Sequence, residues 1–178
     1  DTDISIVSNI VPWQFGKTPT HYIFENDGLG NFTNVTQKFG LDFKESGNIR
    51  DIVWKDLNND SFLDAIVAGY WMPIKVFLND GKKLILQKNT HLENTNGWWN
   101  SIKVHDFDKD GDLDVLAVNL NSNTAPKTLY LFKNDGKGHF SIADLPEKMS
   151  NFGGSPGGVS IASFIDYNND GWLDLFVG

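Results

Sequence analysis

The stretch DFDKDGDLD, residues Asp106 to Asp114, decides how this sequence folds. It recurs as DLNNDSFLD at Asp56 to Asp64 and as DYNNDGWLD at Asp166 to Asp174, and each copy runs directly into an apolar segment (AIVAGY, VLAVN and LFVG). One pattern recurring along a chain indicates a repeat architecture. We therefore interpret the chain as a series of similar units, each marked by one acidic loop.

A second motif alternates with the first. The triplet Asn-Asp-Gly stands between apolar segments in FENDGLGNF (Phe24 to Phe32), FLNDGKKL (Phe77 to Leu84) and FKNDGKGHF (Phe132 to Phe140). Such a triplet predicts a β-hairpin, because Asn, Asp and Gly tolerate positive φ. Each unit then holds four short strands, with the acidic loop joining the first two and the Asn-Asp-Gly turn joining the last two. In the second unit we expect strands at 100–105, 113–119, 128–133 and 139–143.

Repeated units of four antiparallel strands predict an all-β protein, a β-propeller in which each unit is one blade. Asp3 aligns with the last aspartate of each acidic loop, at spacings of 61, 50 and 60 residues, so residues 1–178 form one segment with units of approximately 3–63, 64–113 and 114–174. Propellers close with about four to eight blades. About three blades are therefore expected to be part of a larger ring, or to pair with a second chain across their open edges.

The acidic loops are predicted calcium sites, about three in number. Ca²⁺ prefers six to eight oxygen ligands, which a tight loop presents from alternate positions. Three loops in phase make solvated acidic turns without metal the weaker interpretation, because carboxylates this close repel one another. The expected side-chain ligands at positions 1, 3, 5 and 9 are Asp56, Asn58, Asp60 and Asp64; Asp106, Asp108, Asp110 and Asp114; and Asp166, Asn168, Asp170 and Asp174. Position 7 would offer the backbone carbonyl of Phe62, Asp112 or Trp172.

The helix-loop-helix calcium site is the main rival for these loops. That motif needs a bidentate Glu at position 12. Here position 12 is Val67, Ala117 or Val177, so the helical version is excluded. Position 6 is Gly in the second and third loops but Ser61 in the first, where a positive φ would cost about 1 kcal/mol. We expect the first loop to bind calcium least tightly.

At these residues the sequence resembles the FG-GAP or VCBS-type repeats, whose best-known members are the N-terminal propellers of integrin α subunits. The strings GWWNSIKVHDFDKDGDLDVLAVN and IDYNNDGWLDLFVG carry the resemblance, which extends over essentially the whole chain. It implies an extracellular, secreted or cell-surface propeller of seven blades, stabilised by calcium, with a role such as cell adhesion. It also implies that the cation loops lie on one face and the ligand on the other.

Aromatic residues fall in the connections expected on the face without acidic loops. Together with neighbouring asparagines, such residues suit a protein or carbohydrate ligand. The alternative is that they pack between blades. Trp98 and Trp99 are adjacent, so in an extended segment only one of them is expected to be exposed. The candidate ligand-binding residues are Trp13, Tyr70, Trp71, Trp98 and Trp99.

Composition narrows the remaining function classes. The formal charge is −8 and Arg50 is the only arginine, so nucleic-acid binding is not expected. No apolar run approaches the roughly 18 residues that a membrane span needs, so membrane insertion is not expected either. The chain has no cysteine, which excludes disulfides and thiol catalysis within it.

Two functions stay open, and the sequence favours the first. One is a calcium-binding recognition module that presents loops to a protein or glycan. The other is the scaffold or active-site portion of an extracellular carbohydrate-active enzyme, a lyase or a hydrolase. No constellation of catalytic residues is identified. Acid and base side chains gathered near Tyr70 and His91 would favour the enzyme, whereas an open face rich in aromatic and amide groups would favour binding.

Overall fold

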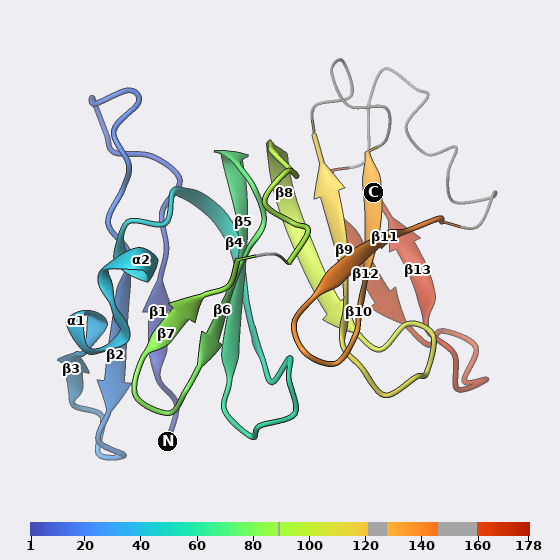
Figure 1. Ribbon diagram of the computed structural model, residues 1–178, viewed down its shortest axis with the longest axis horizontal. Coiled ribbons are helices and arrows are strands. Elements are labelled where there is room, and N and C mark those ends of the chain that lie inside the picture. The colour runs from blue at the N-terminus through green and yellow to red at the C-terminus, as the bar shows by residue number, and fades with distance from the viewer. Residues whose placement is uncertain (89, 121–127, 146–159) are drawn as a thin grey trace.

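The computed structural model describes residues 1–88, 90–120, 128–145 and 160–178 of the chain (Figure 1). Strands dominate this described part, and two four-residue helices accompany them. The strands are β1 (Ile4–Ile6), β2 (Tyr22–Asn26), β3 (Phe32–Asn34), β4 (Asn48–Lys55), β5 (Asp64–Met72), β6 (Lys75–Asn79), β7 (Leu84–Leu86), β8 (Gly97–His105), β9 (Asp114–Asn119), β10 (Leu129–Asn134), β11 (Phe140–Ala143), β12 (Ala162–Ile165) and β13 (Asp174–Val177). The helices are α1 (Thr36–Phe39) and α2 (Leu41–Lys44).

The strands form two complete blades between two partial ones. Strands β4-β5-β6-β7 and β8-β9-β10-β11 are antiparallel blades, which join where Tyr70 of β5 pairs with Trp98 of β8. Before them lies the sheet β1-β2-β3, and after them the pair β12-β13. This curled antiparallel arrangement confirms the predicted all-β class and a partial β-propeller.

Asp3, which the repeat aligns with the last aspartates of the acidic loops, occupies their place in the fold. Its Oδ1 accepts a hydrogen bond from the backbone N–H of Asn26 at 2.9 Å. Asp64 accepts the same bond from Asn79 at 2.8 Å, and Asp114 accepts it from Asn134 at 2.9 Å. Strands β1, β2 and β3 therefore correspond to the last three strands of a blade, and β12 and β13 to the first two.

The hydrophobic core lies between successive blades. In β5, Ala65 and Val67 point into a cluster shared with the preceding sheet, whereas Ile66 points into a cluster shared with the next blade. In β9, Val115 faces back and Leu116 faces forward in the same way. Alternate residues of a strand point to opposite faces, so these central strands are buried on both sides and contain almost only apolar residues.

Polar contacts also join the strands of neighbouring blades. The carboxylate of Asp51 in β4 accepts a hydrogen bond from the backbone N–H of Ile102 in β8 at 2.9 Å. Trp54 of β4 donates its indole N–H to the hydroxyl of Ser5 in β1 at 3.1 Å. These bonds fix the position of one blade against the next.

The two helices were not expected from the sequence. They lie in the connection from β3 to β4, where Thr36 is buried and its hydroxyl oxygen accepts the backbone N–H of Ile23 at 2.9 Å. Phe43 of α2 is fully buried and packs in a T-shaped contact against Phe77. The connection from β3 to β4 thus contributes Phe43 to the hydrophobic cluster between the sheet β1-β2-β3 and the following blade. Among the described residues no helix is long and apolar enough to cross a membrane.

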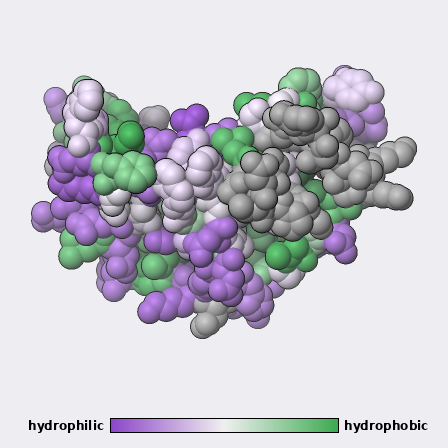
Figure 2. Space-filling model, turned by 90° about the horizontal axis from the view of Figure 1, so that it is seen from above, coloured by the Kyte–Doolittle hydropathy of each residue, from purple (hydrophilic) through white to green (hydrophobic). Residues whose placement is uncertain are grey.

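The two kinds of turn lie on one face of the molecule. In Figure 1 the three acidic loops and the three Asn-Asp-Gly turns are all at the lower end, whereas the β1–β2 connection and the C-terminal end of β5 are at the upper end. Figure 2 looks onto this upper face and shows a molecule whose outline is hollowed on one side. Residues 151–158 (NFGGSPGG), which loosely resemble the phrase that gives the FG-GAP repeats their name, lie outside the described residues.

Candidate functional site

The three acidic loops share one backbone conformation. Position 4 is left-handed in each loop, with φ of 61° at Asn59, 61° at Lys109 and 57° at Asn169. Position 6 is also left-handed, with φ of 74° at Ser61 and 97° at Gly111. Ser61 therefore adopts the positive φ expected of it. The left-handed residue at position 4 was not predicted, although Asn in two of the three loops is the residue type that tolerates it best.

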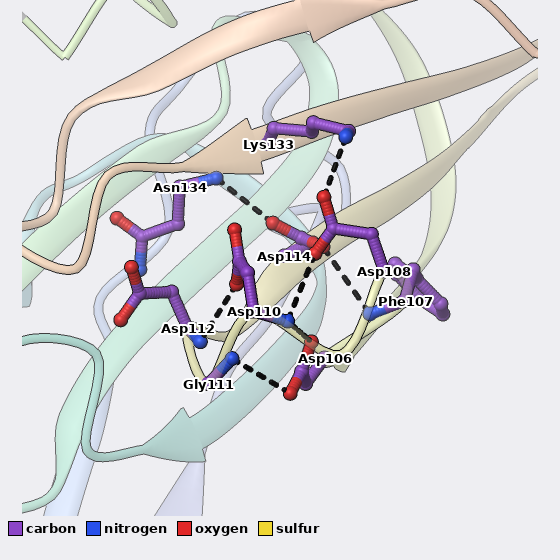
Figure 3. Close-up of polar contacts among 9 residues, drawn as sticks. All are labelled: Asp106, Phe107, Asp108, Asp110, Gly111, Asp112, Asp114, Lys133 and Asn134. Atoms are coloured by element: carbon purple, nitrogen blue, oxygen red, sulfur yellow. Dashed lines mark hydrogen bonds and ion pairs between the residues drawn. The ribbon is translucent and has the colours of Figure 1, made fainter.

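In the second loop the carboxylates are held by backbone N–H groups (Figure 3). Asp106 accepts the N–H of Asp110 at 3.2 Å on one oxygen and the N–H of Gly111 at 3.0 Å on the other. Asp110 in turn accepts the N–H of Asp112 at 2.9 Å. The first and third loops repeat these bonds with Asp56 and Asp60, and with Asp166 and Asp170.

The aspartate at position 9 ties each loop to its blade. Asp114 is 0% exposed, and it accepts the backbone N–H of Phe107 at 3.2 Å and that of Asn134 at 2.9 Å. Asp64 makes the equivalent bonds with Leu57 and Asn79. Burial raises the pKa of both aspartates, although these N–H groups act in the opposite direction. The nearby loop carboxylates raise it further.

These donor groups fit a hard divalent cation. Side-chain oxygens of Asp106, Asp108 and Asp114 all lie within 4.8 Å of one another. Only one cationic group among the described residues meets this cluster closely: Lys133 donates to Asp108 at 2.5 Å and thereby lowers the pKa of Asp108. Oxygen donors of this kind and spacing are those that Ca²⁺ prefers. A cation here would offset the charge repulsion that the loop otherwise carries.

The first and third loops have an amide at position 3. Asn58 donates its side-chain N–H to Asp60 at 2.9 Å, and Asn168 donates to Asp170 at 3.0 Å. The amide oxygen of each accepts the N–H of the position-5 residue and keeps a second lone pair. The structure therefore places the predicted side-chain ligands of each loop around one turn, while their metal-binding role stays a prediction.

Two contacts between successive loops were missed by sequence reasoning. Asn134 donates its side-chain N–H to the backbone carbonyl of Leu57, in the acidic loop of the preceding blade, at 3.0 Å. Lys109 donates to the carbonyl of Gly171, in the next loop, at 2.9 Å and lies 3.4 Å from the ring centre of Trp172. The recurrence of Asn before Asp-Gly was the available signal, but the sequence does not show which carbonyl this amide reaches.

The aspartates of the Asn-Asp-Gly turns do not belong to the acidic loops. Asp27 accepts the backbone N–H of Leu29 at 2.8 Å, and Asp80 accepts that of Lys82 at 2.9 Å. The pKa of Asp27 is lowered chiefly by the hydrogen bond from the side chain of Asn31. The pKa of Asp80 is lowered chiefly by the hydrogen bond from the backbone N–H of Lys83. These carboxylates stabilise the hairpin turns.

On the opposite face the predicted aromatic residues separate into three kinds. Trp99 is 2% exposed, donates its indole N–H to the carbonyl of Thr95 at 2.7 Å and packs against Tyr130, so its prediction as a ligand-binding residue is wrong. It belongs to the core because β8 begins at Gly97 and turns Trp99 inward and Trp98 outward. Trp13 is fully exposed on the β1–β2 connection.

The other aromatic residues form what we call the aromatic cluster: Phe15, Tyr70, Trp71 and Trp98. The ring centres of Trp71 and Trp98 are 5.4 Å apart, and those of Tyr70 and Trp98 are 5.9 Å apart. Phe15 meets Trp71 edge-on at 6.2 Å. A cavity of about 650 Å³ borders the cluster between the β1–β2 connection and the end of β5. Figure 2 shows pale and green atoms gathered on the left half of this face.

The cavity gives no support to the enzyme alternative. Its described lining includes Lys17 but no carboxylate and no histidine. His91 lies in a different cavity together with Glu93. There the ring of His91 bonds the carbonyl of Phe140 at 3.1 Å, and Glu93 accepts the backbone N–H of Thr90 at 2.9 Å. The face near Tyr70 is thus open, aromatic and rich in amides, which favours binding.

Comparison with solved structures shows a similar fold. One such structure is that of a lectin from Agrocybe aegerita, and it is described as the structural basis of the lectin's specific recognition of non-reducing terminal N-acetylglucosamine. The two chains are 20% identical with a TM-score of 0.55, and the similarity covers 89% of this chain and 40% of the lectin chain. This chain therefore spans about 40% of the length of the lectin. No curated protein matches it.

Comparison with known families gives a match to the FG-GAP-like repeat at residues 56–117 and 106–177. The first range begins at the first acidic loop and contains the strands β5 to β8 and most of β9, and the second contains the last two acidic loops. The matched ranges cover well over half of the sequence. This chain belongs to the FG-GAP-like repeat family.

Proposed function

We propose that this chain is part of a calcium-stabilised β-propeller that recognises a protein or glycan. The observation that carries the proposal is the division of the molecule into two faces. Three acidic loops with one backbone conformation lie at one end, and the aromatic cluster with its cavity lies at the other. A rigid scaffold with binding groups on its loops is the usual arrangement of a recognition domain.

The acidic loops would support this function by holding the strands of each blade in place. Each loop joins the first two strands of a blade, and in the two complete blades the buried aspartate at position 9 connects it to the third strand. A cation at positions 1, 3 and 5 would remove the repulsion between these carboxylates and so stabilise the blade. We propose a location outside the cell, because loops of this kind suit the calcium concentrations found there, on the order of millimolar.

The edge of β13, unpaired within the described part of the chain, suggests that this part of the propeller contacts further strands. Among the described residues β13 pairs with β12 alone, and Phe176 of β13 is 65% exposed. An unpaired strand edge with apolar side chains favours pairing with another strand. We propose that further blades or a second chain cover these edges. Light scattering should show association of this 178-residue chain, and a monodisperse monomer would contradict the proposal.

A thermal melt with millimolar Ca²⁺ against excess EDTA tests the calcium role. Three loops filled about tenfold above their dissociation constants would add about 4 kcal/mol, which raises the melting temperature by about 10 °C. Asp106→Asn should remove about a third of this shift, since it weakens one loop of three. Asp135→Asn is the matched control, because Asp135 lies in an Asn-Asp-Gly turn and bonds Lys137 and His139. An unchanged melt would exclude the cation sites.

A further inference from the structure

We propose that the cavity beside the aromatic cluster binds a neutral pyranose sugar. The inference rests on the proposed recognition function and names the ligand class for it. The cavity lies between residues 9–17 of the β1–β2 connection and Asn48, Tyr70 and Trp71 of the adjoining blade. Its volume of about 650 Å³ falls within the range of small-molecule sites.

The conformation of Trp71 indicates that its exposed ring has a role. Trp71 has φ of 57°, which a bulky side chain rarely adopts, and its side chain is 58% exposed. It lies at the irregularity in the pairing of β5 with β8, between the paired residues Tyr70 and Met72. A bulge of this kind redirects a side chain. Because the ring is not buried in the core, core packing does not explain the strained backbone of Trp71. Strained residues of this kind cluster at binding sites.

The groups around Trp71 match the surface of a sugar. Phe15 stands edge-on to its ring and is 93% exposed, so two aromatic surfaces face the cavity. Flat aromatic faces contact the C–H faces of a pyranose, while amide groups exchange hydrogen bonds with its hydroxyls. Such amides are present in the lining as Asn9, Gln14 and Asn48.

The charge of the lining selects a neutral ligand. Lys17 is the only charged residue among the described lining residues, and it is exposed. One exposed ammonium does not form the cluster of cations that a phosphate or a strongly acidic ligand would need. The described lining residues also include no carboxylate of the kind that a basic peptide would need. Aromatic and amide groups therefore provide most of the recognition.

The experiment uses the whole chain in calcium and methyl glycosides of glucose, galactose and N-acetylglucosamine as probes. Ligand-observed NMR and tryptophan fluorescence measure binding. At least one glycoside should bind, and Trp71→Gly should weaken it by about tenfold or more, the loss expected for one stacked aromatic contact. Because glycine adopts positive φ without strain, this gain offsets part of the loss of the ring contacts with Phe15 and Trp98, and the same variant should still melt in a cooperative transition. Thus a lost affinity is separated from a lost fold.

Phe32→Ala is the matched control, since Phe32 is an aromatic residue 45% exposed in β3 and outside the cavity. It should leave the affinity unchanged. Binding that Trp71→Gly does not weaken would overturn the site. Methyl glucuronide is added as an anionic probe, and binding of this probe only, abolished by Lys17→Met, would overturn the neutral ligand. A chain that melts higher in calcium but binds no glycoside would overturn this inference and leave the calcium-stabilised propeller in place.

Discussion

Asn134→Ala should destabilise the protein far more than its position in a surface turn suggests. Asn134 is 6% exposed, and its amide makes two bonds. It donates to the buried carbonyl of Leu57 in the preceding blade at 3.0 Å and accepts the N–H of the buried Gly138 at 3.1 Å. The substitution leaves both backbone groups without these partners, and each such loss costs about 1–3 kcal/mol.

The total loss should be about 2–6 kcal/mol, which lowers the melting temperature by about 4–24 °C for a chain of this size. Differential scanning calorimetry in EDTA measures the effect without any contribution from calcium. Asn79→Ala is the control, because Asn79 is only partly buried and its amide donates to the exposed Leu63 of its own blade at 3.1 Å. If both variants lose the same stability, the bond between blades does not hold the interface, and the reasoning is refuted.

Three further predictions concern single positions. Ser61→Gly removes the strain of φ 74° and should raise the melting temperature by about 2–4 °C, as measured by a thermal melt; a decrease would show that Ser61 is not strained. His21 is 0% exposed, and burial lowers its pKa below the ordinary value of 6.5, so the unfolded chain takes up the proton first. Melting temperatures should therefore fall as the pH drops below about 6.5, and His21→Gln should flatten this fall. Gly69→Ala would place a methyl group 1.9 Å from the carbonyl oxygen of Asn48, and chemical denaturation should show a loss of about 3 kcal/mol or more; near-native stability would contradict that close approach.

The blade pattern could be predicted because local chemistry fixes it. Asn-Asp-Gly requires turns that accept positive φ, and Asp at alternate positions requires a tight loop, so strands 128–133 and 139–143 were expected within one residue of β10 and β11. The same reasoning aligned Asp3 with Asp64 from sequence alone, and the two make the same hydrogen bond. Each of these features depends on residues close together in the chain.

Features that depend on neighbouring blades could not be predicted. The start of β8 at Gly97 rather than at residue 100 results from pairing with β5, which also explains why Trp99 joins the core. The hydrogen bond from Asn134 to Leu57 joins residues 77 positions apart, so no local sequence pattern predicts it. For the same reason the sequence could place aromatic residues on the upper face but could not separate Trp71 from Trp99.

Placing all acidic loops at one end makes the molecule electrically asymmetric. Eleven of its nineteen aspartates belong to these loops, so nearly half of its 23 acidic residues lie on the side opposite the aromatic cluster. Three divalent ions would cancel six of the eight net negative charges, and all on that one side. The bare chain would therefore turn its loop end away from an anionic surface and present the aromatic end to it. Calcium would weaken this orienting force.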